Sequence, residues 1–143
     1  MLSILVEDYL MVGQNAIVRK IVQKVDSAGN YSPGLQDLLS TPVCVDMIIK
    51  ATTDAVNKYL PDGYITVGRG IEYVHDFSSL LGMTINVKAT LTAIEGKHLF
   101  FSISVWDEMG DVGHGTHERI VVKRDEVLQK ARERANFLVQ RTF

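Results

Sequence analysis

The feature that most constrains the fold of this chain is a long helical segment that is apolar around most of its circumference. Residues 41–60 begin with Thr41-Pro42, a hydroxyl N-cap followed by proline at the first helical position, and end before the turn residues 61–63. Its apolar side chains follow helical spacing and form one broad face, made of Cys44, Val45, Met47, Ile48, Ile49, Ala51, Ala55, Val56, Tyr59 and Leu60. Because only a narrow polar stripe remains, we expect other elements to wrap around this helix and largely enclose it.

Extended segments on both sides of the helix are able to enclose it. Residues 16–25 predict a first strand, and residues 64–75, 83–91, 97–107 and 112–123 predict four more. Gly68 and Gly70 are expected bulge points in the second of these strands. Residues 26–40 predict a loop with one helical turn, and residues 125–140 predict a terminal helix. The order indicates an α+β fold in which an antiparallel sheet of about five strands curls around one helix.

Length and composition indicate one globular domain over residues 1–143, with 46% hydrophobic and 22% charged residues. The net charge of −2, without any basic run, makes nucleic acid or an anionic membrane an unexpected partner. Cys44 is the single cysteine, so no intrachain disulfide is expected and a reducing, cytoplasmic location is favoured. No segment approaches the roughly 20 apolar residues of a membrane helix, and the first residues lack a signal-peptide pattern.

Five motifs give the stretch from Thr41 to Val122 a specific resemblance. They are STP at 40–42, YLPDGYITVG at 59–68, VH at 74–75, LLGMTINVKATL at 81–92 and GHGTHERIVV at 113–122. In this order they resemble the fluoroacetyl-CoA thioesterase-like branch of the hot-dog superfamily. The resemblance implies a hot-dog fold, hydrolysis of a short acyl-CoA thioester, and no cofactor beyond the coenzyme A of the substrate. It also implies a homodimer with active sites at the subunit interface, which would cover the long free edge of the sheet.

The resemblance implies roles for three residues. Thr41 matches the catalytic threonine of the family, at a helix amino end where free N–H groups favour a thioester oxygen; its plainer role is the N-cap. His75 matches the catalytic histidine, which would transfer a proton to or from water; the alternative is a structural histidine at a strand end. Gly68 matches an active-site glycine that admits the acyl group, or is a bulge point only.

One departure from the family pattern bears on catalysis. The characterised fluoroacetyl-CoA enzymes carry a glutamate eight residues after the threonine, and Ile49 occupies that position here. Isoleucine neither accepts a proton nor orients a histidine. Asp46, one helical turn earlier, is the candidate replacement carboxylate, although an i,i+4 pair with Lys50 is the plainer explanation. Two alternatives therefore stay open: a non-catalytic acyl-CoA-binding or regulatory module, and a dehydratase or hydratase, which would need a placed histidine–carboxylate pair.

The stretch GHGTHERIVV raises the question of why polar and backbone-permissive residues precede an ordinary core strand. On a strand His114 and His117 point to opposite faces, so we expect no shared metal. The glycines are expected to admit a close approach of the neighbouring backbone. Thr116 and Arg119, with the residues between them, are expected to border the acyl site; the alternative for Arg119 is a salt bridge at the surface or at a dimer interface.

Contacts with the rest of the substrate are predicted from charge and position. Arg69, Lys88 and Arg124 are candidates for the phosphates of coenzyme A, together with Lys123. The loop at 26–40 is a candidate lid over the acyl pocket.

Overall fold

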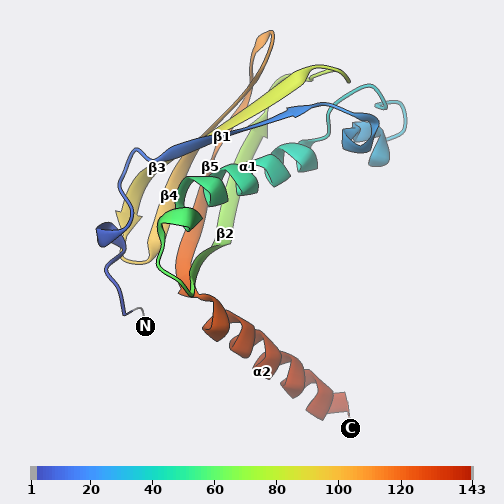
Figure 1. The fold of residues 1–143 in the computed structure, drawn as a ribbon. Helices are drawn as coiled ribbons and strands as arrows, with labels where there is room; N and C mark the ends of the chain where they lie inside the picture. Colours follow the sequence, from blue (N-terminus) through green and yellow to red (C-terminus); the bar gives the residue numbers. More distant parts are fainter. Residues whose placement is uncertain (1–2, 143) are drawn as a thin grey trace.

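A five-stranded antiparallel sheet curls around one long helix in the computed structural model, which describes residues 3–142 (Figure 1). The strands are β1 (Asn15–Ile21), β2 (Tyr64–His75), β3 (Thr84–Glu95), β4 (His98–Asp107) and β5 (Gly110–Lys123). They lie in the spatial order β1-β3-β4-β5-β2. Helix α1 (Thr41–Val56) lies on the concave side of the sheet, and α2 (Arg124–Thr142) follows β5. The predicted α+β arrangement is confirmed.

Short 3-10 turns correct several predicted boundaries. They are η1 (Val6–Asp8), η2 (Lys24–Asp26), η3 (Ala28–Asn30) and η4 (Asn57–Tyr59). The first strand ends at Ile21 because Gln23 and Asp26 form a capping box that starts η2. The central helix ends at Val56 instead of continuing to residue 60, since the chain tightens there into η4.

The amino end of α1 also differs from the prediction. Ser40 is the N-cap, with extended backbone angles, so the prediction that Thr41 takes this role is wrong. Thr41 is the first helical residue and Pro42 follows it. The Ser40 side chain makes no capping hydrogen bond. The side chain of Thr41 is therefore not used to cap the helix.

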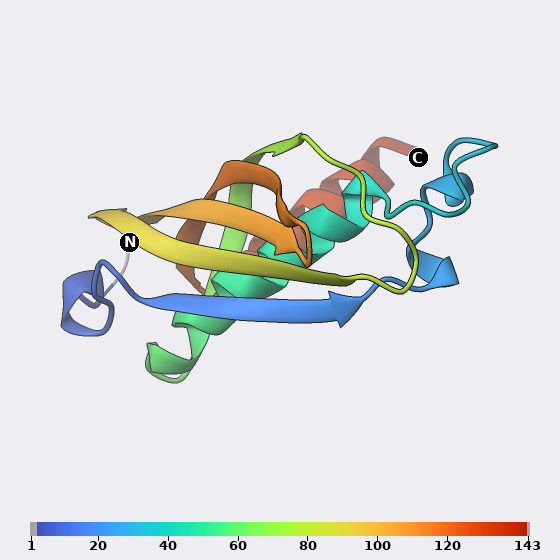
Figure 2. The same ribbon diagram turned by 90° about the horizontal axis from the view of Figure 1, so that it is seen from above.

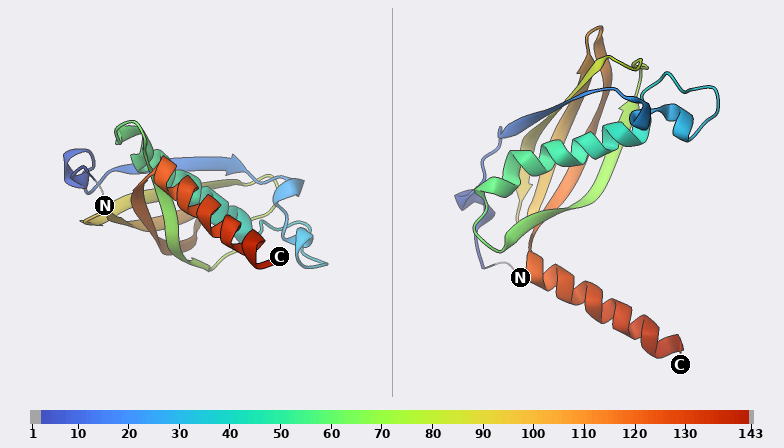
Figure 3. Two further views of the ribbon diagram at one scale, coloured as in Figure 1. Left: turned by 90° about the horizontal axis from the view of Figure 1, so that it is seen from below. Right: turned by 45° about the vertical axis from the view of Figure 1, so that its right-hand side comes forward.

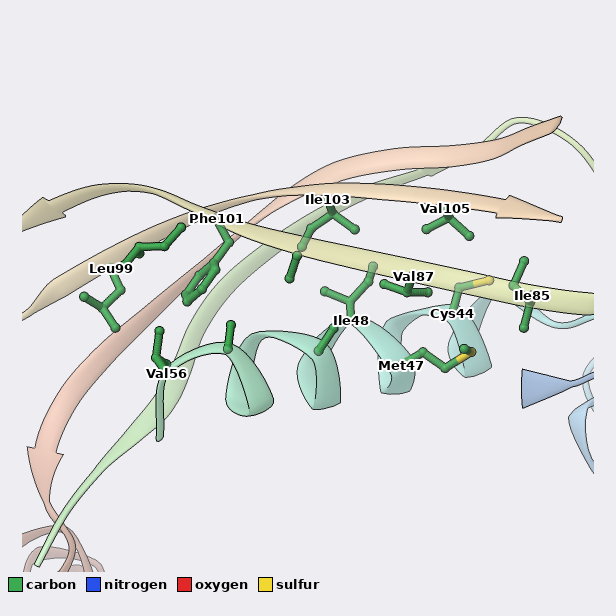
Figure 4. Close-up of a cluster of buried hydrophobic side chains, with 14 of the residues drawn as sticks. Cys44, Met47, Ile48, Val56, Ile85, Val87, Leu99, Phe101, Ile103 and Val105 are labelled. Carbon is green, nitrogen blue, oxygen red and sulfur yellow. The ribbon is translucent and has the colours of Figure 1, made fainter. Parts of the chain in front are cut away.

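The core lies between α1 and the strands β3 and β4 (Figure 4). Figure 4 shows the helix side chains Cys44, Met47 and Ile48 pointing toward the strands. Each side chain of this layer is at most 3% exposed; its strand members include Ile85, Val87, Leu99, Phe101, Ile103 and Val105. The helix and strand faces predicted from periodicities of 3.6 and 2 therefore meet in one layer.

The sheet curls around α1 as predicted and leaves part of the helix surface uncovered. The helix packs mainly against β1 and β3 and touches β2 less (Figure 2). Ile49 remains 42% exposed and Tyr59 51% exposed. Ile49 lies on the same side of α1 as Thr41, two helical turns further on. The chain by itself thus leaves an apolar strip of the helix open.

Strands β2 and β5 approach each other so closely that two glycines have no room for a side chain. A Cβ atom at Gly115 would lie 2.0 Å from the carbonyl oxygen of Glu72, and one at Gly113 would lie 2.3 Å from the hydroxyl of Tyr73. The expectation that the glycines of GHGTHERIVV admit a close backbone is confirmed. The register also shifts between Gly68 and Gly70, so the predicted bulge is present.

Helix α2 extends away from the end of the sheet at which β2 begins (Figure 3). The backbone N–H of Arg124 donates to the carbonyl of Gly63 at 3.0 Å, and two acids stand in the first turn. The predicted terminal helix is confirmed, with bounds one or two residues wider at each end. None of the helices in the described part of the chain is both long and apolar enough to cross a membrane.

The close approach of β2 and β5 predicts an asymmetry between two glycine substitutions. Gly115→Ala should lower the free energy of unfolding by about 3 kcal/mol, because its Cβ forces the two backbones apart. Gly70→Ala is the matched control, since a Cβ there meets nothing within 4 Å. Urea unfolding of both variants measures the difference. Equal destabilisation would show that the strands do not pack as described.

Candidate active site

Thr41 and His75 meet at the amino end of α1. Thr41 Oγ1 lies 2.8 Å from His75 Nδ1, although the residues are 34 positions apart. Both line a hollow of about 250 Å³, whose wall includes Leu35, Leu38 and Phe77. The proposed catalytic threonine and histidine therefore share one cavity within a single chain.

Backbone hydrogen bonds fix both residues of this pair. The N–H of Ser40 donates to the carbonyl of Asp26 at 2.9 Å, which anchors the start of α1. The N–H of Leu39 donates to the carbonyl of Ser79 at 2.9 Å, which ties the same segment to the loop after β2. The N–H of Asp76 donates to the carbonyl of Val112 at 2.8 Å, which holds the end of β2 against β5. The site is thus positioned by backbone contacts on both sides.

The surroundings of His75 favour its neutral form. Burial lowers the pKa of its imidazole, while the Phe77 backbone and the charge of Asp76 act in the opposite direction. Its Nε2 atom is buried and has no hydrogen-bond partner in residues 3–142. Nδ1 contacts the hydroxyl of Thr41, which lines the hollow, so a neutral imidazole is able to take a proton through Thr41 Oγ1 from a water molecule bound there.

Two further polar atoms near this end of the sheet have no hydrogen-bond partner in the described chain: Ser40 Oγ and the hydroxyl oxygen of Tyr73. Tyr73 lies beside Cys44, its ring centre is 5.7 Å from that of His75, and burial raises the pKa of both the phenol and the thiol. A buried hydroxyl left unpaired costs about 1–3 kcal/mol. Ser40 and Tyr73 were not among the site residues predicted from the sequence. The position of Ser40 within the STP motif was the one signal that pointed to it.

A second polar cluster surrounds Arg119, which is only 5% exposed. Its Nε donates to Thr66 Oγ1 at 2.8 Å, and its Nη2 donates to the Thr66 carbonyl at 2.9 Å. Its Nη1 lies 3.2 Å from Nε2 of His117. All three acceptors are neutral, and no carboxylate in the described residues lies within ion-pair distance of this guanidinium. Arg119 therefore does not form the surface salt bridge that we considered.

The two clusters lie far apart in one chain. Gly68 pairs with Arg119, whereas His75 pairs with Gly113. Seven residues of extended strand separate Gly68 from His75, which corresponds to roughly 20 Å. A single chain therefore does not bring Gly68 and Arg119 to the Thr41–His75 pair.

Two other predicted site residues also lie outside the hollow. Asp46 forms an exposed ion pair with Lys50 at 2.9 Å and makes no contact with His75. Thr116 lies on the opposite face of β5 from His117 and lines a groove on the outer face of the sheet, next to Glu118. Within one chain neither residue lies where it can act together with His75.

The predicted phosphate ligands do not gather into one site. Arg69 lies 3.7 Å from Glu118, and Arg124 pairs with the adjacent Asp125 at 3.4 Å. Lys88 is on β3, which two other strands separate from β2. His114 and His117 face opposite sides as predicted: His114 is exposed beside Asp76 at 3.2 Å, and His117 is buried.

A family comparison matches most of the chain. The model of the fluoroacetyl-CoA-specific thioesterase family matches residues 22–125, which include every residue of both clusters. A fluoroacetyl-CoA thioesterase from Streptantibioticus cattleyicolor is 30% identical over 98 residues, 68% of this chain and 70% of that protein.

Solved structures agree with this match. A hot-dog-like protein from Thermanaerovibrio acidaminovorans superposes with a TM-score of 0.85 at 26% identity, covering 90% of this chain and 95% of the other. A variant of the fluoroacetyl-CoA thioesterase FlK in complex with acetyl-CoA superposes with a TM-score of 0.79 at 25% identity, covering 87% of this chain and 98% of the other. The sheet and helix described above therefore form the hot-dog fold.

The surroundings of His75 predict its titration. Its midpoint in the folded protein should lie below 6.5, because burial disfavours the imidazolium. Asp76→Asn should lower the midpoint further, since it removes a charge that favours protonation. NMR titration of the imidazole resonances, assigned with His75→Gln, measures both values. A midpoint at or above 6.5, or an upward shift in Asp76→Asn, would contradict this description.

Proposed function

Since the chain belongs to the fluoroacetyl-CoA-specific thioesterase family, we propose that it hydrolyses a short-chain acyl-CoA thioester to the free acid and coenzyme A. The observation that carries the proposal is the 2.8 Å contact between Thr41 and His75 in a hollow at the amino end of α1. This arrangement joins a proton acceptor to a helix terminus that stabilises negative charge.

In the proposed reaction the Thr41 hydroxyl donates to the unprotonated Nδ1 of His75, and the buried Nε2 carries the hydrogen of the neutral imidazole. Thr41 Oγ1 takes a proton from water as the water oxygen bonds to the thioester carbonyl carbon, and the hydroxyl proton of Thr41 passes to Nδ1. The carbonyl oxygen, now negative, lies toward the free N–H groups of the first turn of α1. The carbon–sulfur bond breaks, and the proton held on Nδ1 passes back through Thr41 Oγ1 to the thiolate of coenzyme A.

The departure at Ile49 is compatible with this reaction. A thiolate whose conjugate acid has a pKa of about 8.5 leaves with little help from an acid, so one imidazole serves for both proton transfers. Ile49 stands where the family has a glutamate, and its side chain is 42% exposed. An apolar residue at this position also supports a second candidate: a module that binds acyl-CoA without hydrolysing it. A dehydratase is less well supported, since no carboxylate in the described residues bonds to His75.

We further propose that the functional unit is a homodimer joined through β2. This strand is an edge of the sheet, and α1 beside it leaves an apolar strip open. Antiparallel pairing of two copies of β2 brings the carboxyl end of one strand beside the amino half of the other. His75 of one chain then lies near the partner's Gly68 and the partner's Arg119, so each complete site takes residues from both chains.

The remaining proposed features concern the substrate and the location of the protein. Leu35 and Leu38 line the hollow, which supports a role for the loop at 26–40 as a lid. We still propose Arg69, Lys88 and Arg124 as ligands of the coenzyme A phosphates. Their role is to be tested in the dimer. The single cysteine, buried and unpaired with another cysteine, supports a reducing cytoplasmic location.

The hydrolase proposal predicts loss of turnover when the Thr41–His75 pair is broken. Thr41→Val and His75→Gln should each lower kcat/KM for acetyl-CoA by about 10²-fold or more, measured as free thiol release. The wild-type rate should rise with pH through a midpoint below 6.5, because deprotonation of His75 generates the base.

Asp46→Asn serves as the control, and its kcat/KM should stay within about twofold of the wild type because the Asp46–Lys50 pair is exposed. Tight binding of acyl-CoA without any thiol release by the wild type would replace the hydrolase with the binding module. A large loss in Asp46→Asn would restore Asp46 as the missing carboxylate.

The composite site predicts complementation between inactive chains. Equal amounts of His75→Gln and Arg119→Met protein, unfolded together and refolded, should recover about a quarter of the wild-type activity, since half of the dimers are mixed and each mixed dimer has one intact site. Each variant refolded alone supplies the baseline. Recovery no higher than this baseline, for a protein that sedimentation shows to be dimeric, would contradict shared sites.

A further inference from the structure

A single bulge in β2 decides which face of the sheet His75 occupies. Thr66 and Gly68 pair with Val121 and Arg119 on the concave face. After the bulge the concave positions are Ile71, Tyr73 and His75. Side chains alternate along a strand, so if this sequence ran through Arg69 in regular alternation, without a bulge, the concave positions would be 70, 72 and 74. His75 would then point away from α1 and from Thr41.

His117 holds the bulge from the neighbouring strand. Its Nδ1 lies 2.7 Å from the carbonyl oxygen of Gly70, the residue directly after the bulge. That carbonyl is turned toward the concave side of β5, where the imidazole is 4% exposed. A Cβ at Gly68 would lie 3.2 Å from Cε1 of His117. The absence of a side chain at Gly68 therefore leaves the room that the imidazole needs.

The hydrogen-bond partners of His117 allow only one protonation state. A carbonyl oxygen only accepts, so Nδ1 carries the hydrogen that binds Gly70. A guanidinium only donates, so Nε2 accepts from Arg119, 3.2 Å away. His117 is therefore neutral, and burial together with the charge of Arg119 lowers the pKa of its imidazole.

Arg119 connects this histidine to the far end of the helix. It donates to Thr66 through both Nε and Nη2, and the Thr66 hydroxyl donates to Asn57 Oδ1 at 2.5 Å. Asn57 directly follows the last residue of α1. The imidazole thus sits in a buried chain of bonds that runs from the end of α1 to the bulge.

We propose that His117 is a positioning residue for His75: its bond to Gly70 keeps the bulge in place, and the bulge keeps His75 on the face of Thr41. His117 does not touch the substrate in this role. The structural part of the proposal, the claim that His117 holds the bulge, depends only on the pairing register of β2 with β5. Its effect on turnover rests on the proposed thioesterase function.

The structural part is tested first by imidazole 15N NMR on the wild-type protein. His117 should appear as the neutral Nδ1–H tautomer at pH 6, with the Nδ1–H protected from exchange. His117→Gln, by loss of a signal, assigns it among the four histidines. The Nε2–H tautomer or an imidazolium at this pH would overturn the proposal, whatever the enzyme hydrolyses.

Two substitutions then separate the two bonds of His117. His117→Asn places its amide N–H near the position of Nδ1 and retains the bond to Gly70. His117→Gln places its amide near Nε2 and retains only a partner for Arg119. The loss of kcat/KM should be about 10²-fold in His117→Gln, with KM little changed, and at least several-fold smaller in His117→Asn. Equal losses, or a larger loss in His117→Asn, would overturn the proposal.

The resonances of His75 give a readout that does not need turnover. In His117→Gln the pKa of His75 should move up toward 6.5, because the imidazole leaves its buried position. It should stay at the wild-type value in His117→Asn, which retains the bond to Gly70. An unchanged pKa of His75 in His117→Gln would overturn the proposal, and an inactive wild type would refute only the hydrolase.

Discussion

The pairing of β2 with β5 is the constraint on which the rest of the structure depends. It places His75 opposite Gly113, and it is possible only because Gly113 and Gly115 leave no side chain between the strands. The bulge at Arg69 then sets the alternation of the outer half of β2. Thr41 stands within 2.8 Å of His75 because this register and the helix start are both fixed by backbone bonds. A change in the pairing of β2 with β5 would thus displace His75 from Thr41 before it disturbed the packing of the core.

The polar groups behind the site are arranged to keep its imidazoles neutral. Burial acts first on both His75 and His117, and Arg119 reinforces it at His117. The guanidinium itself is satisfied by neutral oxygens and by His117, with no carboxylate among its partners in the described residues. Such a cation is costly to bury, and in the proposed dimer it would face the substrate of the partner subunit. Ile49 replaces the helix carboxylate, and Arg119 has no carboxylate partner in the described residues. The proposed site therefore carries little negative charge, which favours an anionic intermediate.

Much of this fold follows from periodicity. Alternation in residues 83–105 and helical spacing in residues 41–60 predicted the buried layer that contains Ile48 and Phe101, and the glycines at 68 and 70 predicted the bulge. The sheet curls around α1 as predicted, but the apolar circumference of the helix did not show which apolar side chains this chain would leave uncovered. Ile49 is the clearest example, with an apolar side chain left exposed.

The site was predictable only in part. Family motifs identified Thr41 and His75, and the structure brings them together. The bond between His117 and Gly70 joins residues 47 positions apart, and its presence depends on a register that no local pattern fixes. The orphan hydroxyl of Tyr73 was missed for a similar reason, since its surroundings arise from Cys44 and Gly113 on two other elements.

The central claim is that the imidazole of residue 75 and the first turn of α1 act together on one thioester carbonyl. A crystal structure with a non-hydrolysable acyl-CoA analogue tests this most directly. The account predicts the carbonyl oxygen against the free amides that begin α1 and the carbonyl carbon one water molecule away from Thr41 Oγ1, which contacts Nδ1 of His75. An acyl group bound elsewhere, for example in the groove on the outer face beside Thr116, would contradict it.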